Sequence, residues 1–155
     1  MSWRFKLVTR PYGGVTEGPI WDGDNILFTH IPSHRILRYD PDNNKISEYL
    51  GDTNHTNGLA HDSLGNLFGC CSGGRSIVRF GTDGITKTVA DQVDGIKLNT
   101  PNDLAVDRQG RIWFTNPWNS GNIDPREHED LDNRSVLRAD PEVDGIYSVT
   151  RVTFD

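Results

Sequence analysis

Three stretches of the chain repeat one pattern of polar and apolar positions. Each stretch contains a polar residue, then an apolar pair and an aspartate, and reaches an aromatic-containing apolar run after a turn; in the first two stretches a small residue, glycine, follows the polar one. The stretches are residues 16–29, 56–69 and 98–117. None of them places apolar residues at positions i, i+3 and i+4, which is the spacing of an amphipathic helix. The pattern therefore predicts strands joined by tight turns.

Glu17, Asn57 and Asn102 fall at equivalent positions of the three stretches, separated by 40 and 45 residues. A period of this length that holds only strand and turn signals is typical of propeller blades. We therefore predict an all-β fold in which residues 1–155 form a partial β-propeller of about three blades. The expected blades are roughly residues 16–50, 56–90 and 101–155. The strands expected after the three blade starts are residues 26–29, 35–39, 46–50, 67–70, 76–80, 86–90, 112–115, 135–141 and 145–154.

Two segments fall outside the repeat. Residues 1–15 are expected to supply a leading strand, because residues 3–8 alternate between apolar and polar positions and a terminal strand commonly completes the last blade of a closed propeller. Residues 116–134 form a polar insertion in the third blade, and this is where we expect any helix. Its acidic run, residues 127–130, lacks the glycine of a calcium loop, so we expect a solvated loop there.

The composition of the chain argues against several kinds of partner. The net charge is −6, and no cluster of Lys and Arg is present to neutralise a run of phosphates, so we expect no nucleic-acid partner. No stretch approaches the roughly 18 apolar residues that span a bilayer, so we expect no membrane partner. The first residues show no export signal, which makes the cytoplasm the expected location. The adjacent Cys70 and Cys71 are expected to be buried free thiols.

The candidate chemistry lies where equivalent strands begin. In a propeller those positions converge on the axis, where the oxygens of Glu17 and Asn102 could surround a hard cation. The histidines indicate less: His30 and His34 are separated by a proline that prevents a helical ligand pair, and the other three have no partner at ligand spacing. The chain contains neither the phosphate-loop motif nor the serine-nucleophile motif G-x-S-x-G.

The sequences TEGPIW, TNGLAHDSLGNLF and LNTPNDLAVDRQGRIWFTNP together resemble the SMP-30/gluconolactonase/luciferin-regenerating family. The resemblance implies a partial six-bladed propeller that spans about half of the family's length. It also implies one divalent cation, calcium or zinc, over the central channel, and hydrolysis of a small-molecule sugar lactone. Carried over residue by residue, Glu17 matches the metal-binding glutamate. Asn102 matches an asparagine that faces the metal or its bound substrate.

The resemblance also implies substrate-side positions for Asp103, the neighbour of Asn102, and for Asn57, at the equivalent place on the second blade. This chain departs from the family at Cys71-Ser72, where many relatives have Glu-His, and at Phe114-Thr-Asn-Pro117, where F-T-D-P is usual.

The family's later metal-binding residues have no counterpart within residues 1–155. We therefore expect a truncated, inactive or nearly inactive lactone hydrolase whose general base is beyond Asp155. We also expect it to self-associate through exposed blade faces. Two alternatives stay open, a noncatalytic propeller scaffold and an ester- or organophosphate-cleaving enzyme of the same fold.

Overall fold

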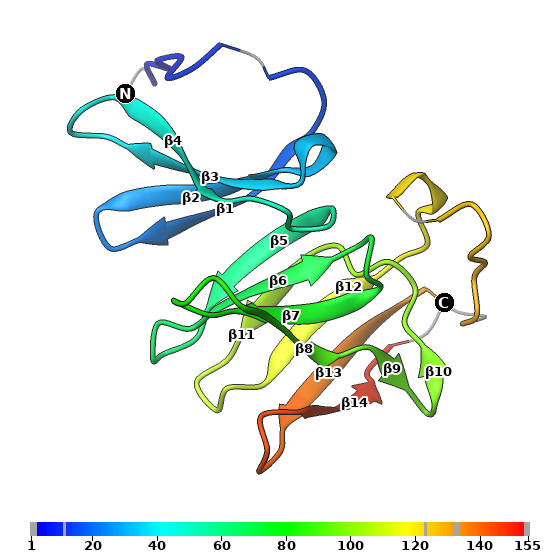
Figure 1. Ribbon diagram of the computed structural model, residues 1–155. Coiled ribbons are helices and arrows are strands. Elements are labelled where there is room, and N and C mark those ends of the chain that lie inside the picture. The colour runs from blue at the N-terminus through cyan, green and yellow to red at the C-terminus, as the bar shows by residue number, and fades with distance from the viewer. Residues whose placement is uncertain (1–2, 11, 123, 132–133, 154–155) are drawn as a thin grey trace.

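The computed structural model describes residues 3–10, 12–122, 124–131 and 134–153, and they form three four-stranded antiparallel sheets (Figure 1). Each sheet is a meander in which consecutive strands pair. The first contains β1 (Thr16–Asp22), β2 (Asn25–His30), β3 (Arg35–Asp40) and β4 (Lys45–Leu50). The second contains β5 (Thr56–His61), β6 (Leu67–Cys71), β7 (Ser76–Phe80) and β8 (Thr86–Ala90). The third contains β11 (Leu104–Val106), β12 (Ile112–Asn116), β13 (Ser135–Pro141) and β14 (Tyr147–Arg151).

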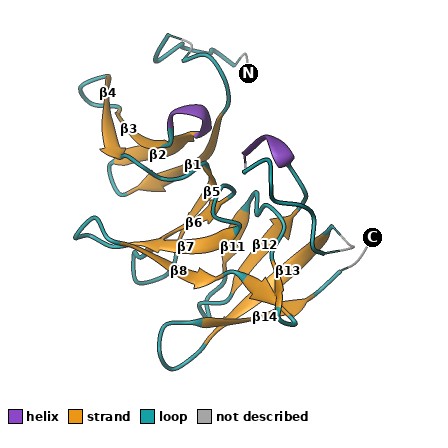
Figure 2. Cartoon of the chain, turned by 45° about the vertical axis from the view of Figure 1, so that its right-hand side comes forward, coloured by secondary structure: helices purple, strands orange, loops and turns teal. Residues whose placement is uncertain are grey.

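The three sheets follow one another as blades, and their first strands lie side by side, with β5 between β1 and β11. A short hairpin of β9 (Gln92–Val93) and β10 (Ile96–Lys97) joins the second blade to the third. Within the described ranges, helix is limited to two 3-10 turns, η1 (Ile31–Ser33) and η2 (Ser120–Asn122), coloured purple in Figure 2. In the part of the chain that is described, no helix is long and apolar enough to cross a membrane. The predicted all-β partial propeller is therefore confirmed.

Two of the three repeat aspartates, Asp62 and Asp107, close the turn between the first and second strands of their blades. Asp107 Oδ1 accepts the backbone N–H groups of Gln109 and Arg111, at 2.9 and 3.0 Å. The Trp113 indole and then the Arg111 guanidinium donate to this carboxylate, which lowers its pKa from 3.8 to about 2. Gly110 supplies the positive φ of +77° that the turn requires. Asp62 and Asp107 are therefore turn residues, whereas the Asp22 carboxylate lies 3.5 Å from His61 Nε2 and 4.0 Å from Arg38.

The core lies between the blades, because both faces of the second sheet are buried. Residues alternate along a strand, so successive side chains of β6 point toward different neighbouring blades. Cys70 packs between the second and third sheets, whereas Cys71 packs between the first and second. Both thiols are free and buried, as expected, and burial raises the pKa of each. A thiol with a raised pKa stays protonated and is a poor nucleophile. We therefore assign both cysteines to core packing and not to catalysis.

The N-terminal segment does not form the expected strand. Residues 3–8 have no strand pairing, and Trp3, Phe5 and Leu7 are exposed. Alternation alone does not make a strand, because a strand also needs a partner edge to supply hydrogen bonds. Two further features were not anticipated from the sequence, namely the β9–β10 hairpin and the η1 turn outside the insertion.

Candidate active-site pocket

The starts of the first strands approach one another so closely that glycine is required after two of the candidate residues. A Cβ atom on Gly18, which has a φ of +55°, would lie 2.7 Å from the backbone oxygen of Asn57. A Cβ atom on Gly58 would lie 2.5 Å from Asp103 Oδ1. The Gly58 N–H donates to the Asn102 carbonyl oxygen at 2.8 Å. Gly18 and Gly58 are thus the points at which the first strands of neighbouring blades meet.

This close approach brings Glu17, Asn57 and Asn102, from three different blades, to one pocket of about 470 Å³. The other residues that line the pocket are Val15, Ile31, Pro32, His55, Asn119 and Gly121. Asp103 does not line it. Asp103 is exposed and borders a separate shallow depression of about 210 Å³, and its Oδ1 accepts the N–H of Leu104 at 2.9 Å.

Asn57 carries a buried acceptor without a partner. Its side chain is only 5% exposed, and no hydrogen bond from the described residues reaches its Oδ1 atom. Leaving such an acceptor unsatisfied costs about 1–3 kcal/mol, so buried polar groups of this kind call for a partner from outside the fold. Glu17 is exposed, and its carboxylate makes no hydrogen bond or ion pair with the described residues, although Thr29 Oγ1 donates to its backbone carbonyl at 3.1 Å.

A buried side-chain amide without a partner in the described part of the chain also borders a second depression that Asn102 lines. Asn116 is fully buried, and within the described residues neither polar atom of its side chain has a hydrogen-bond partner. It lines a depression of about 410 Å³ together with Asn102 and Thr115. Asn116 is the residue at which this chain departs from the F-T-D-P pattern, so that departure was a usable signal.

His55 is a pocket residue that the sequence did not indicate. Its ring lies against that of His34, with centroids 4.1 Å apart, and its backbone N–H donates to His34 Nδ1 at 3.1 Å. Burial, and then the neighbouring His34, lower the pKa of His55, so its imidazole is neutral near pH 7. The two residues are 21 apart, and both have positive φ, as do Asp52 and Asn54. Several residues of this connection between blades thus have left-handed backbone conformations, which cost energy. The spacing of residues in the sequence does not predict such a conformation.

The donors in the pocket are oxygen-rich but few. Among the described residues, no group of three or more His, Cys, Asp or Glu side chains gathers as a metal site. A cation at this pocket would rely on the Glu17 carboxylate together with amide oxygens. That donor set suits a hard cation such as calcium better than a sulfur- or imidazole-preferring one.

Comparison with known proteins gives one consistent result. Residues 15–153 match the family model described as SMP-30/Gluconolactonase/LRE-like region. A gluconolactonase of Zymomonas mobilis is 27% identical over 146 residues, covering 82% of this chain and 40% of that protein.

Solved structures agree with this match. A gluconolactonase from Xanthomonas campestris superposes with a TM-score of 0.80 at 30% identity, covering 90% of this chain and 47% of that one. A second structure, of a putative gluconolactonase, gives a TM-score of 0.78 at 28% identity, with coverages of 92% and 50%. The virginiamycin B lyase of Staphylococcus aureus, at 18% identity and a TM-score of 0.55, shares the fold alone.

The chain spans about half the length of the relatives that it matches. The family model, by contrast, covers nearly all of this chain, from the last residue before β1 to the last residue described. The chain therefore belongs to the SMP-30/gluconolactonase/LRE-like family.

Proposed function

We propose that this chain forms part of a cation-dependent hydrolase of sugar lactones. The observation that carries the proposal is the convergence of Glu17, Asn57 and Asn102 from three blades on one pocket, with Asn57 Oδ1 buried and without a partner in the described chain. The similarity to proteins named gluconolactonases supports the reaction class.

Glu17 and Asn102 are the proposed cation ligands, with calcium favoured over zinc by the oxygen donors. When bound, the cation would polarise the lactone carbonyl. Asn57 and Asn102 would hydrogen-bond the sugar hydroxyls through their side-chain amides. Asp103 lies outside the pocket, and its packing against Gly58 supports a role in holding the Asn102 backbone in place.

Two of the residues that line the pocket have ionisable side chains, Glu17 and His55. Glu17 is assigned to the cation and the His55 ring lies against that of His34, so we place the general base outside residues 1–155, in line with relatives about twice as long. The chain by itself would then hydrolyse lactone slowly or not at all. Its two or three donors fall short of the roughly six to eight that calcium takes, so its own cation affinity would be low. A cytoplasmic location, with two free thiols, remains part of this proposal.

The test is a calorimetric titration with calcium and with zinc beside a D-glucono-1,5-lactone hydrolysis assay, on the same proteins. Glu17→Gln keeps the side-chain shape and removes the charge that offsets a divalent ion, so it is expected to abolish cation binding. Asp144→Asn, at an exposed carboxylate in the β13–β14 turn, is the matched control and is expected to bind as the parent does. Equal binding by Glu17→Gln and its parent would contradict the assignment.

The same assays separate the alternatives. Neither cation binding nor lactone hydrolysis, in this chain or in a longer chain that contains it, would favour a noncatalytic propeller scaffold. Hydrolysis of an aryl ester or an organophosphate without hydrolysis of the lactone would favour the other hydrolase class.

A further inference from the structure

The segment between β12 and β13 forms one wall of the pocket. We call its described residues, 117–122 and 124–131, the wall segment. Asn119 and Gly121 of this segment line the pocket together with the residues at the blade starts. Thr100 holds the near end of the segment, because its Oγ1 accepts the Asn119 N–H at 2.8 Å and its backbone N–H donates to the Pro117 carbonyl at 2.8 Å.

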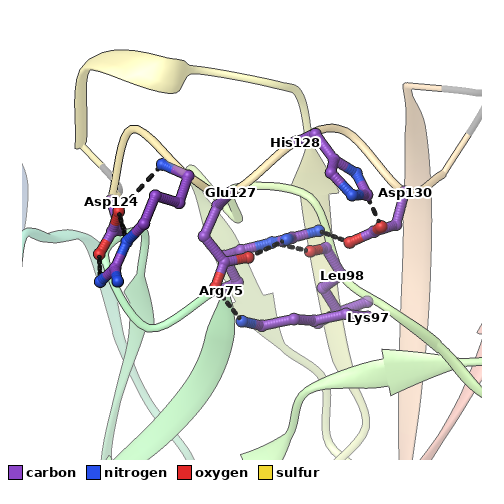
Figure 3. Close-up of polar contacts among 8 residues, drawn as sticks. Arg75, Lys97, Leu98, Asp124, Glu127, His128 and Asp130 are labelled. Atoms are coloured by element: carbon purple, nitrogen blue, oxygen red, sulfur yellow. Dashed lines mark hydrogen bonds and ion pairs between the residues drawn. The ribbon is translucent and has the colours of Figure 1, made fainter.

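The far end of the wall segment is held by Arg75 from a different blade. Arg75 lies in the turn between β6 and β7 and is only 1% exposed. Its Nη1 donates to Glu127 at 2.5 Å and its Nη2 to Asp130 at 2.8 Å, while its Nε donates to the Leu98 carbonyl at 2.6 Å (Figure 3).

Arg75 also reaches the near end of the wall segment. Its guanidinium carbon lies 5.2 Å from the centroid of the Trp118 ring, within the range of a cation–π interaction. Trp118 directly precedes Asn119. One buried side chain therefore contacts the segment on both sides of the residues that line the pocket.

The charges of the cluster are matched. Arg75 and Lys97 face Glu127 and Asp130, and Lys97 Nζ lies 3.0 Å from the second oxygen of Glu127. His128 lies at the surface, with its Nδ1 3.0 Å from Asp130. A buried guanidinium that keeps all its partners is stable, but losing one leaves the others uncompensated. Only the planar fork of arginine reaches two carboxylates and a carbonyl at once, so lysine is not an equivalent replacement.

We propose that Arg75 is a positioning residue that fixes the wall segment and so presents Asn119 to the bound ligand. Arg75 itself does not line the pocket, so it acts through the segment that it holds. The part of this proposal that concerns ligand rests on the proposed function, whereas the ordering of the wall segment by Arg75 does not.

Hydrogen exchange of the full chain tests the ordering. Arg75→Lys is expected to speed amide exchange in residues 117–122 by about tenfold or more, while β5 and β6 keep their protection, since local opening need not involve the core strands. Arg126→Gln is the matched control, because Arg126 pairs with Asp124 in the same segment but is largely exposed, and it is expected to leave exchange unchanged.

Glu127→Gln is a milder second variant, in case Arg75→Lys does not fold. Glu127 is only partly buried, and its replacement leaves Arg75 bound to Asp130. It is expected to change exchange in the same direction and by less. The double variant is expected to exceed Arg75→Lys only slightly, because both changes break one contact. A ¹⁹F resonance from 5-fluorotryptophan at position 118, assigned with Trp118→Phe, is expected to shift in Arg75→Lys and not in Arg126→Gln.

Lactone hydrolysis then tests the consequence. In a longer chain that contains these residues and hydrolyses D-glucono-1,5-lactone, Arg75→Lys is expected to raise KM by about tenfold or more and to change kcat little, because a misplaced wall weakens binding more than chemistry. If no longer chain that contains residues 1–155 hydrolyses the lactone, the proposed function fails, and exchange alone decides the role of Arg75. Unchanged exchange in residues 117–122, or equally faster exchange throughout the chain in both variants, would overturn the proposal.

Discussion

Two buried polar regions of this chain differ in how completely their side chains are paired. The Arg75 cluster satisfies its guanidinium with two carboxylates and a carbonyl. The pocket leaves Asn57 Oδ1 without a partner in the described chain and the Glu17 carboxylate facing solvent. Burying a polar group with its hydrogen-bond partners costs little stability, whereas burying it without a partner destabilises the folded state. We interpret the Arg75 cluster as a region that stabilises the structure, and we propose that the pocket is a region that binds a ligand.

The largest effect on stability is expected from a substitution of Arg75. Arg75→Met is expected to lower the free energy of unfolding by about 3 kcal/mol, at the low end for a broken buried pair because both carboxylates are partly exposed. Arg126→Gln, which removes an exposed pair, is expected to cost less than about 1 kcal/mol. Urea unfolding of both variants measures the difference. Equal effects would mean that the Arg75 cluster is not a stabilising unit.

Gly58→Ala is the next largest expected effect. Its Cβ atom would meet Asp103 and the Asn102 backbone, so the starts of β5 and β11 must separate, at a cost of about 1–3 kcal/mol. Gly51→Ala is the matched control, because its Cβ atom would meet only the movable end of the Glu48 side chain. Thermal melts compare the two variants. A melt of Gly58→Ala as high as that of the control would show that the blades do not meet through this glycine.

Asn57→Leu tests whether the unpaired amide of the pocket contributes to binding or to stability. Removing a buried acceptor that has no partner relieves a desolvation penalty, so stability is expected to stay within about 1 kcal/mol of the parent or to rise. Cation or lactone binding by the protein is expected to weaken. Urea unfolding and calorimetric titration measure the two effects. A loss of several kcal/mol in stability would indicate that Asn57 is a structural residue.

The smallest expected effect concerns acid stability at Asp107. The folded-state pKa of about 2 lies below the ordinary 3.8, so this carboxylate stabilises the fold above about pH 4, and the contribution disappears as the pH falls through 2. Asp107→Asn is expected to flatten the dependence of the melting temperature on pH between 4 and 2. A parent-like slope in the variant would assign the acid sensitivity to other groups.

The sequence predicted those features that depend on local chemistry. The three sheets could be located from the alternation of the strands and from Asp and Gly turns such as those at residues 62–65 and 107–110. The equivalent positions of Glu17, Asn57 and Asn102 in the repeat indicated residues that line one pocket. The sequence did not reveal features that depend on contacts between distant segments. The acidic run at 127–130 was expected to be solvated, but Glu127 and Asp130 bind an arginine more than 50 residues away in the sequence.

Two other failures have the same cause. His55 enters the pocket through a blade connection with left-handed residues, and its contact with His34 spans 21 positions. Residues 3–8 show the alternation of a strand, but no neighbouring strand of this chain pairs with them in the described structure. A period-2 pattern reports which faces a segment would have, and not whether a partner is present.

The central claim is that the pocket, and not the acidic run, binds a divalent cation. Calcium titration followed through the ¹⁵N side-chain amide signals tests it directly. We expect the signals of Asn57 and Asn102 to shift together with one weak dissociation constant in the parent, and to stay fixed in Glu17→Gln. The account would be contradicted if those two signals did not move in the parent while calcium shifted the backbone signals of Glu127 and Asp130.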